Sequence, residues 1–209
     1  MLRRILVIAL LVGLSACGGM RSPVALLLPH RHHHPTAEAA ATTPAPPAPK
    51  PAEGLWAILD PGCPKPNAAN IHAWPKCASP FWISRDKALV VRSATGKTRS
   101  LIDASFAADY SLAPGNPMIA QVGTEKDGYL FLALTDLSED DQGRLIGAVG
   151  AAVACPKPSG GGLAIKPNLN GCETESLDTV RKAAAETLQD RSTLTEVAWI
   201  APGAPSGAP

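Results

Sequence analysis

Two cysteine pairs, each local in the sequence, constrain the fold of this chain more than any other feature. Cys63 and Cys77 bracket the stretch CPKPNAANIHAWPKC, and Cys155 and Cys172 bracket CPKPSGGGLAIKPNLNGC. Both loops are rich in Pro, Gly and Asn, so strand pairing within them would not hold them closed. Local closure is also the most probable in an unfolded chain. We therefore expect two disulfides, Cys63–Cys77 and Cys155–Cys172, each stabilising the fold by about 3 kcal/mol.

Other uses of these four cysteines stay open at this point. Four cysteines allow three connectivities, and a first loop folded over the strand that ends at Cys155 would bring Cys63 or Cys77 to it. A tetrahedral zinc site is another alternative, although structural zinc sites use close C-x₂₋₄-C pairs and this chain has none. The total of five cysteines is odd, so the fifth, Cys17, needs an explanation of its own.

The N-terminus supplies that explanation. Arg3 and Arg4 precede an apolar run over residues 5–14, the charge and hydrophobicity pattern of a secretory signal. This run is too short for a transmembrane helix, which needs about 20 residues. Leu14, Ser15, Ala16 and Cys17 follow in order, and this tetrapeptide resembles the lipobox of bacterial lipoproteins.

The resemblance covers the first 17 residues only. It implies that residues 1–16 are a signal peptide and that Cys17 becomes the acylated first residue of the mature chain. Because Gly18 and not Asp follows, it also implies a place in the bacterial cell envelope, anchored by lipid in the outer membrane and facing the periplasm. Ordinary cleavage just past Gly13 is the alternative.

Residues 17–52 are predicted to be a lipidated cysteine followed by an extended tether. Residues 35–52 hold six Pro in eighteen positions without apolar periodicity. At about 3.1 Å per residue in a polyproline-like state, the 35 residues from 18 to 52 would reach at most roughly 110 Å. Within them, the histidine tract could bind a transition metal, or it is low-complexity drift in a linker; it consists of His30, His32, His33 and His34.

Residues 53–202 are predicted to form a single globular domain of class α+β, and residues 203–209 a disordered tail. The domain would be an antiparallel sheet of six to eight strands with one C-terminal helix packed on one face. Runs rich in β-branched and aromatic residues predict the strands: GLWAIL, PFWIS, ALVVRS, TRSLIDAS, PMIAQVGTE, GYLFLALTDL, RLIGAVGAAVAC and STLTEVAWI. A helix is expected over residues 175–190, capped by Thr174 or Ser176.

Two strands indicate how the sheet is covered. In YLFLAL, apolar residues fall on both faces, which predicts a central strand buried on both sides. In the next strand, Ala148, Gly150, Ala152 and Ala154 share a face that carries almost no side-chain bulk. We expect the helix, which is itself slim at residues 183–185, to lie close against that face.

Catalytic motifs are absent or incomplete in this sequence. His72 is the only histidine of the domain, and it lies in the first cysteine loop. Ser84 and Lys87 fit the S-x-x-K of serine acyl-enzymes, but the companion motifs S-D-N and K-T-G are missing. The acidic stretch DLSEDDQG, residues 136–143, lacks the glycine offset and closing Glu of an EF-hand, so a solvated hairpin tip is favoured over a calcium site.

Charge narrows the partners further. Without residues 1–16 the chain has 17 Lys and Arg, two fewer than the 19 of the whole, against 18 Asp and Glu. A formal charge of −1 offers no basic surface for nucleic acid, and we expect no cofactor. Four aromatic residues gather around the first cysteine loop and form either a packed corner of the core or a recognition surface: Trp56, Trp74, Phe81 and Trp82.

The sequence therefore predicts a lipid-anchored envelope domain that acts by binding or scaffolding, with the membrane and an envelope protein as its partners. Two other classes stay open. A metal-handling lipoprotein would bind metal through the histidine tract. A periplasmic hydrolase would have an active site that matches none of the motifs considered above.

Overall fold

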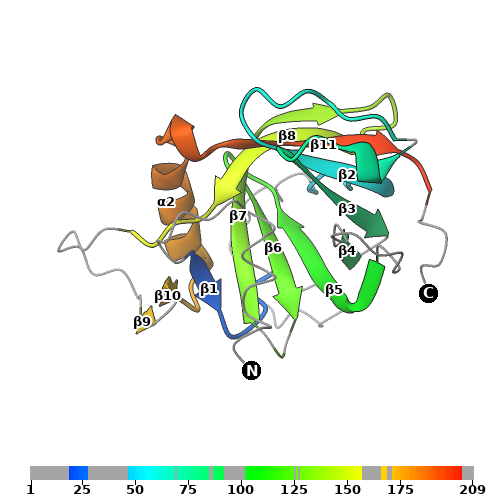
Figure 1. Cartoon of the computed structure of the whole chain (residues 1–209). Coiled ribbons are helices and arrows are strands. Elements are labelled where there is room, and N and C mark those ends of the chain that lie inside the picture. Colours follow the sequence, from blue (N-terminus) through cyan, green and yellow to red (C-terminus); the bar gives the residue numbers. More distant parts are fainter. Residues whose placement is uncertain are drawn as a thin grey trace.

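The short apolar runs of the domain become the strands of one continuous sheet in a computed structural model of the chain (Figure 1). The structure describes residues 19–27, 47–68, 70–84, 87–91, 102–124, 126, 128–156, 166–168 and 171–203. Eight strands correspond to the eight runs predicted from the sequence: β2 (Gly54–Leu59), β3 (Ala78–Ser84), β4 (Lys87–Val91), β5 (Ile102–Ala113), β6 (Met118–Thr124), β7 (Gly128–Glu139), β8 (Leu145–Ala152) and β11 (Thr195–Ala201).

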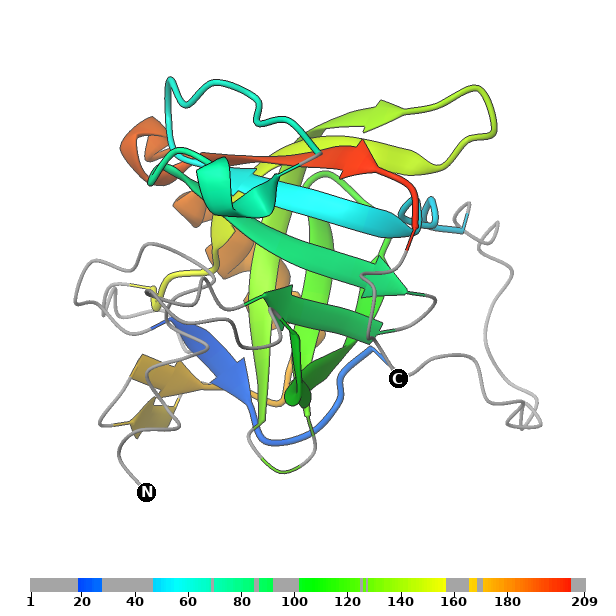
Figure 2. The same ribbon diagram turned by 45° about the vertical axis from the view of Figure 1, so that its right-hand side comes forward.

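These eight strands close into a ring. Each of β2 to β7 pairs antiparallel with the next strand along the chain, and β11 pairs with both β8 and β2. Figures 1 and 2 show the strands curving around a common axis. The predicted antiparallel sheet with a helix is thus confirmed in outline. Its closure was not predicted, because alternation within a strand does not reveal which strand meets β11.

Three further strands of three residues each extend the sheet outside the ring. β1 (Met20–Ser22) pairs antiparallel with β7 and parallel with β10 (Gly171–Glu173), and β9 (Lys166–Asn168) pairs with β10. With them the sheet has eleven strands among the described residues, more than the six to eight predicted. Strands this short leave no readable periodicity in a sequence.

The interior of the ring is filled by side chains from seven of its strands. They form one apolar cluster of buried and partly buried residues, whose largest members are Trp56, Phe81, Met118, Leu134 and Trp199. Because these residues come from all round the ring, they must point inward. Complete burial of a large apolar side chain stabilises the folded state by about 1.5–3 kcal/mol, so this filled interior is a core.

Two additions cover the outer face of the ring. Over β2, β3 and β11, Ile71 and Trp74 of the first cysteine loop pack on Leu55 and Trp82; Ile71 belongs to a 3-10 helix, Ile71–Ala73. Over β5 to β7, the helix α2 (Leu177–Thr187) and β1 cover the other side. A second 3-10 helix, Arg191–Thr193, leads from α2 to β11.

The helix begins where predicted, but it covers a different face from the predicted one. The Ser176 hydroxyl accepts a hydrogen bond from the Thr179 amide and caps α2. Val180 and Ala183 pack with Phe131 on the outside of the ring. The face of β8 without bulk points inward, where Ala148 packs with Trp56 and its cluster, so the prediction that α2 lies on it is wrong.

The faces of β7 agree with the sequence. Tyr129 and Phe131 are buried on the outside of the ring, and Leu134 is buried on the inside. A closed sheet with a helix outside and a packed core inside explains this double burial. Gly150 of β8 lies opposite Leu134 of β7, and a Cβ at Gly150 would come within 2.7 Å of the Leu134 side chain. The small residues of β8 therefore make room for the large side chains of its neighbour.

The N-terminal region differs from the predicted tether. Residues 19–27 belong to the sheet and its outer cover, since Met20 is completely buried among α2 and β7 side chains. Residues 47–52 lie alongside the start of β8, and Ala52 is also completely buried. The folded part therefore includes these two segments in addition to the domain predicted from residue 53 onward.

Candidate functional site

The two predicted disulfides are present with the predicted local pairing. Cys63 pairs with Cys77 and Cys155 with Cys172, with Cα atoms 5.7 and 5.8 Å apart. The first bridge closes the loop that covers β2 and β3. The second joins the chain just past β8 to β10. Each bridge therefore fixes an outer layer of the ring to the strand next to it.

The four aromatic residues of the predicted recognition surface are divided between two sides of the ring wall. Trp56 and Phe81 lie inside the ring, with ring centroids 6.0 Å apart. Trp82 lies outside, 5% exposed, and Trp74 covers it from the cysteine loop. Because the wall separates the two pairs and both are in packed clusters, they do not form a shared binding surface.

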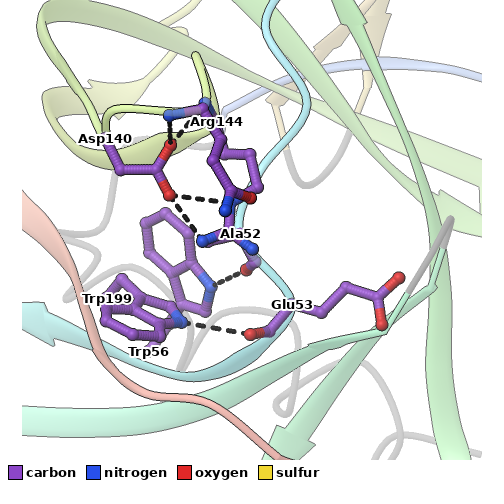
Figure 3. A network of polar contacts seen from close by, with 7 residues as sticks. Ala52, Glu53, Trp56, Asp140, Arg144 and Trp199 are labelled. Carbon is purple, nitrogen blue, oxygen red and sulfur yellow. Dashed lines mark hydrogen bonds and ion pairs between the residues drawn. The ribbon is translucent and has the colours of Figure 1, made fainter.

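Indole hydrogen bonds fix the segments that flank the ring (Figure 3). The Trp56 indole donates to the Ala52 carbonyl at 2.8 Å, and the Trp199 indole donates to the Glu53 carbonyl at 3.1 Å. Trp199 faces Trp56 across the β2–β11 pairing, and the sequence analysis did not include it. Only the alternation within STLTEVAWI could have pointed to it.

Residues 47–53 form a strap across one end of the ring. The Ala52 amide donates to the Leu145 carbonyl at 2.8 Å, and the Leu145 amide donates to the Lys50 carbonyl at 2.9 Å. Ala48 and Ala52 pack on the interior cluster. Since β2 and β8 both begin at this end, the strap lies against the interior cluster beside the first residues of both strands.

The acidic hairpin between β7 and β8 lies at the same end and is ordered by its own residues. Asp140 receives hydrogen bonds from the Arg144 side chain at 2.7 Å and from the Arg144 amide at 2.9 Å (Figure 3). It also receives one from the Gln142 amide at 2.9 Å. The Arg144 hydrogen bond is the main cause that lowers the pKa of Asp140 below its ordinary 3.8. The Asp140 carboxylate therefore stabilises the β7–β8 turn, as expected for a solvated hairpin tip.

The sign of this pKa shift fixes its effect on stability. A carboxyl group whose pKa is lower in the folded protein stabilises the fold at pH values above its ordinary pKa. That contribution is lost as the pH falls through the lowered value. The Asp140 side chain is partly exposed, and its partner Arg144 is exposed, so its contribution is a small surface effect.

The N-terminal segment is the structural feature that the sequence analysis missed. The Met20 amide donates to the Val153 carbonyl at 2.7 Å, and the Thr174 amide donates to the Arg21 carbonyl at 2.9 Å. The side-chain oxygen of Gln121, a residue 2% exposed, accepts from the amides of Leu26 and Leu27 at 2.8 and 3.0 Å. The only signals for this segment were Met20 and the apolar run VALLL.

β1 occupies a position that the ring leaves free. β8 pairs with β7 only from Leu132 onward, so the first residues of β7 have no ring partner on that side. β1 pairs there, with Arg21 opposite Leu130 and Ser22 opposite Tyr129. Backbone groups in a sheet are almost always paired, and β1 satisfies those that β8 does not reach.

Several predicted residues lie outside the described part of the chain. These are Cys17 and the histidine tract, His30, His32, His33 and His34. Ser84 and Lys87 are described, and they pair across β3 and β4 in a hairpin. An acyl-enzyme S-x-x-K needs its serine at a helix start, so this arrangement does not match it. For His72 the structure describes the backbone, in the 3-10 helix of the first cysteine loop.

Within the described ranges, no three His, Cys, Asp or Glu side chains are grouped so that they could hold a metal ion. No helix of those ranges is long and apolar enough to cross a membrane. No family model, curated protein or solved structure matches this chain.

Proposed function

We propose that this protein is a lipid-anchored protein of the bacterial cell envelope, acylated at Cys17, whose domain acts as a binding or scaffolding module. The observation that carries the proposal is the order of the first 17 residues, in which positive charge, an apolar run and Leu14-Ser15-Ala16-Cys17 follow one another. The outer membrane, on its periplasmic side, is the location that this order favours.

The disulfides support an exported protein. Both bridges join residues of the folded domain, and disulfides persist in oxidising compartments such as the periplasm. With both local pairs formed, Cys17 is the one cysteine left for another use, which agrees with acylation.

A filled, closed sheet supports binding more than catalysis. The interior of the ring is a packed apolar core, and the S-x-x-K pair lies in a β-hairpin. Such a ring is a rigid frame that presents loops and hairpins at its two ends. Residues that bind partners concentrate on loops that a rigid scaffold positions, as catalytic residues also do.

Metabolic labelling with a clickable fatty acid tests the anchor in the producing bacterium. The wild-type protein should carry the label and fractionate with membranes, and Cys17→Ser should lose the label and leave the membrane fraction. The matched control is the double variant Cys63→Ala with Cys77→Ala, which should keep the label because it alters a disulfide instead. Unchanged label on Cys17→Ser would contradict the proposal.

A further inference from the structure

We infer that the membrane holding the acylated Cys17 lies directly against the folded domain, beside Gly19, and that no long tether separates them. The inference rests on the proposed function, since it requires the lipid on Cys17. The interacting surface is the outer side of the ring around β1 and the neighbouring helix α2, and its partner is the surface of a phospholipid bilayer.

Chain length sets the first limit. Two peptide units connect Cys17 to Gly19, and consecutive Cα atoms are about 3.8 Å apart, so their Cα atoms can be at most about 8 Å apart. Gly19 is the first described residue, and it is buried and bridged to Ala154. The lipid is therefore held close to the point where the chain enters the sheet. The extended tether would instead have allowed roughly 110 Å.

The entry point is firmly held. β1 is paired on both edges, with β7 on one side and β10 on the other. Met20 and Ser22 are 0% and 1% exposed, and the Met20 amide bonds to Val153. The disulfide Cys155–Cys172 joins the chain next to Ala154 to β10. The domain could move away from the lipidated Cys17 only if all of these contacts broke.

The proline-rich stretch does not add to the distance between the folded domain and the membrane. Leu27 is hydrogen-bonded to Gln121 on the outside of β6, and Lys50 and Ala52 are hydrogen-bonded to the start of β8. Residues 28–46 therefore connect two points of the same fold. A chain segment between two fixed points of one domain cannot set the distance of that domain from its anchor.

The geometry also orients the domain. Gly19 bridges to the chain just past the end of β8, whereas the β7–β8 turn precedes the start of β8. A strand of eight residues is about 25 Å long, so the turn lies about that far from the anchored side. Figure 1 shows β1 and α2 on one side of the ring and the β7–β8 turn on the other. The turn should point away from the bilayer.

Energy transfer to the membrane tests this placement. The mature lipidated protein is reconstituted into vesicles of phosphatidylethanolamine and phosphatidylglycerol that contain an acceptor-labelled lipid. A donor dye is attached at Ala185→Cys on α2 or at Gln142→Cys in the β7–β8 turn, both exposed positions. A matched control carries a flexible insert of about 30 residues between Gly18 and Gly19, with a root-mean-square span of roughly 30 Å.

We expect stronger transfer from position 185 than from position 142, and a loss of about half or more of the transfer at position 185 in the insert control. Equal, weak transfer from both positions that the insert does not change would overturn the inference. Mass spectrometry of the N-terminal peptide accompanies each sample. An unacylated Cys17 would refute the proposed function, whereas an acylated Cys17 with equal, weak transfer would refute only the placement.

Discussion

At the scale of single residues, Met20 and Val24 show how burial separates neighbours in one segment. Met20 is 0% exposed among the side chains of α2 and β7, and Val24 is 48% exposed. Both are apolar and both precede the proline-rich stretch. Amino-acid composition therefore does not distinguish Met20 from Val24. The pairing of β1 in the sheet explains why Met20 is buried and Val24, which follows β1, is exposed.

Truncation of these two side chains should therefore have very different effects. We expect Met20→Ala to lower the free energy of unfolding by about 2–4 kcal/mol, because it leaves a cavity under α2. Val24→Ala should change it by less than about 0.5 kcal/mol. Urea denaturation measures both, in a Cys17→Ser background that avoids the lipid. If Met20→Ala were as harmless as Val24→Ala, residues 19–27 would not belong to the fold.

For single residues, the sequence predicted the features that depend on neighbours in the chain. It did not predict the features that depend on contacts with distant segments. The pairing of Cys63 with Cys77 followed from spacing and loop composition. The separation of Trp56 from Trp82 by the wall of the ring did not, because nearness in sequence says nothing about which side of a sheet a side chain takes. For Met20, the tether prediction relied on prolines that begin only after the segment has left the sheet.

At the scale of elements, the strands and the helix cap were predictable from periodicity and capping chemistry. All eight ring strands overlap predicted runs, and Ser176 caps α2 as one of two candidates. The face that α2 covers was not predictable. Alternation shows that Ala148 and Gly150 share a face of β8, but not whether that face is inside a closed sheet.

The two disulfides belong to different outer layers, so their removal should loosen different elements. In the double variant Cys155→Ala with Cys172→Ala, we expect roughly tenfold faster hydrogen exchange at the Met20 and Thr174 amides, which hold β1 and the chain after β10. The Asp60 amide, bonded to the Cys77 carbonyl, should respond much less.

The first disulfide supplies the matched control. Cys63→Ala with Cys77→Ala should accelerate exchange at Asp60 and leave Met20 and Thr174 nearly unchanged. Mass spectrometry or NMR of the exchanging amides separates the two patterns. Identical patterns for both double variants would mean that each bridge stabilises the whole domain and neither holds a particular layer.

At the scale of the whole molecule, closure of the ring depends on contacts that no local pattern encodes. β8 is followed by the second disulfide, β9, β10 and α2 before β11 returns to pair with both β8 and β2. The ring thus joins residues near position 55 to residues near position 200. Pairings of such long range depend on the complete set of buried faces, so the sequence predicted an antiparallel sheet without predicting its closure.

The closed ring also has two distinguishable ends, and they carry the two large apolar side chains that the described surface exposes. Val24 follows β1 on the anchored side, and Leu137, 38% exposed, lies in the hairpin at the opposite end. Leu137 follows Asp136, whose φ of 48° is unusual for a residue other than glycine, and irregular β7–β8 pairing surrounds it. Bulges of this kind redirect side chains at strand ends.

If the domain binds an envelope protein while its lipid side faces the bilayer, the hairpin is the end that meets the partner. A photo-crosslinking amino acid at Leu137 should then form a defined adduct with an envelope protein in living cells, and the same group at Val24 should form none. Both positions are exposed and apolar, so the comparison isolates their place in the molecule. Immunoblotting for the adduct and mass spectrometry of its second component measure the outcome. Adducts from Val24 without adducts from Leu137 would reverse the assigned orientation, and adducts from neither would remove the hairpin as the binding surface.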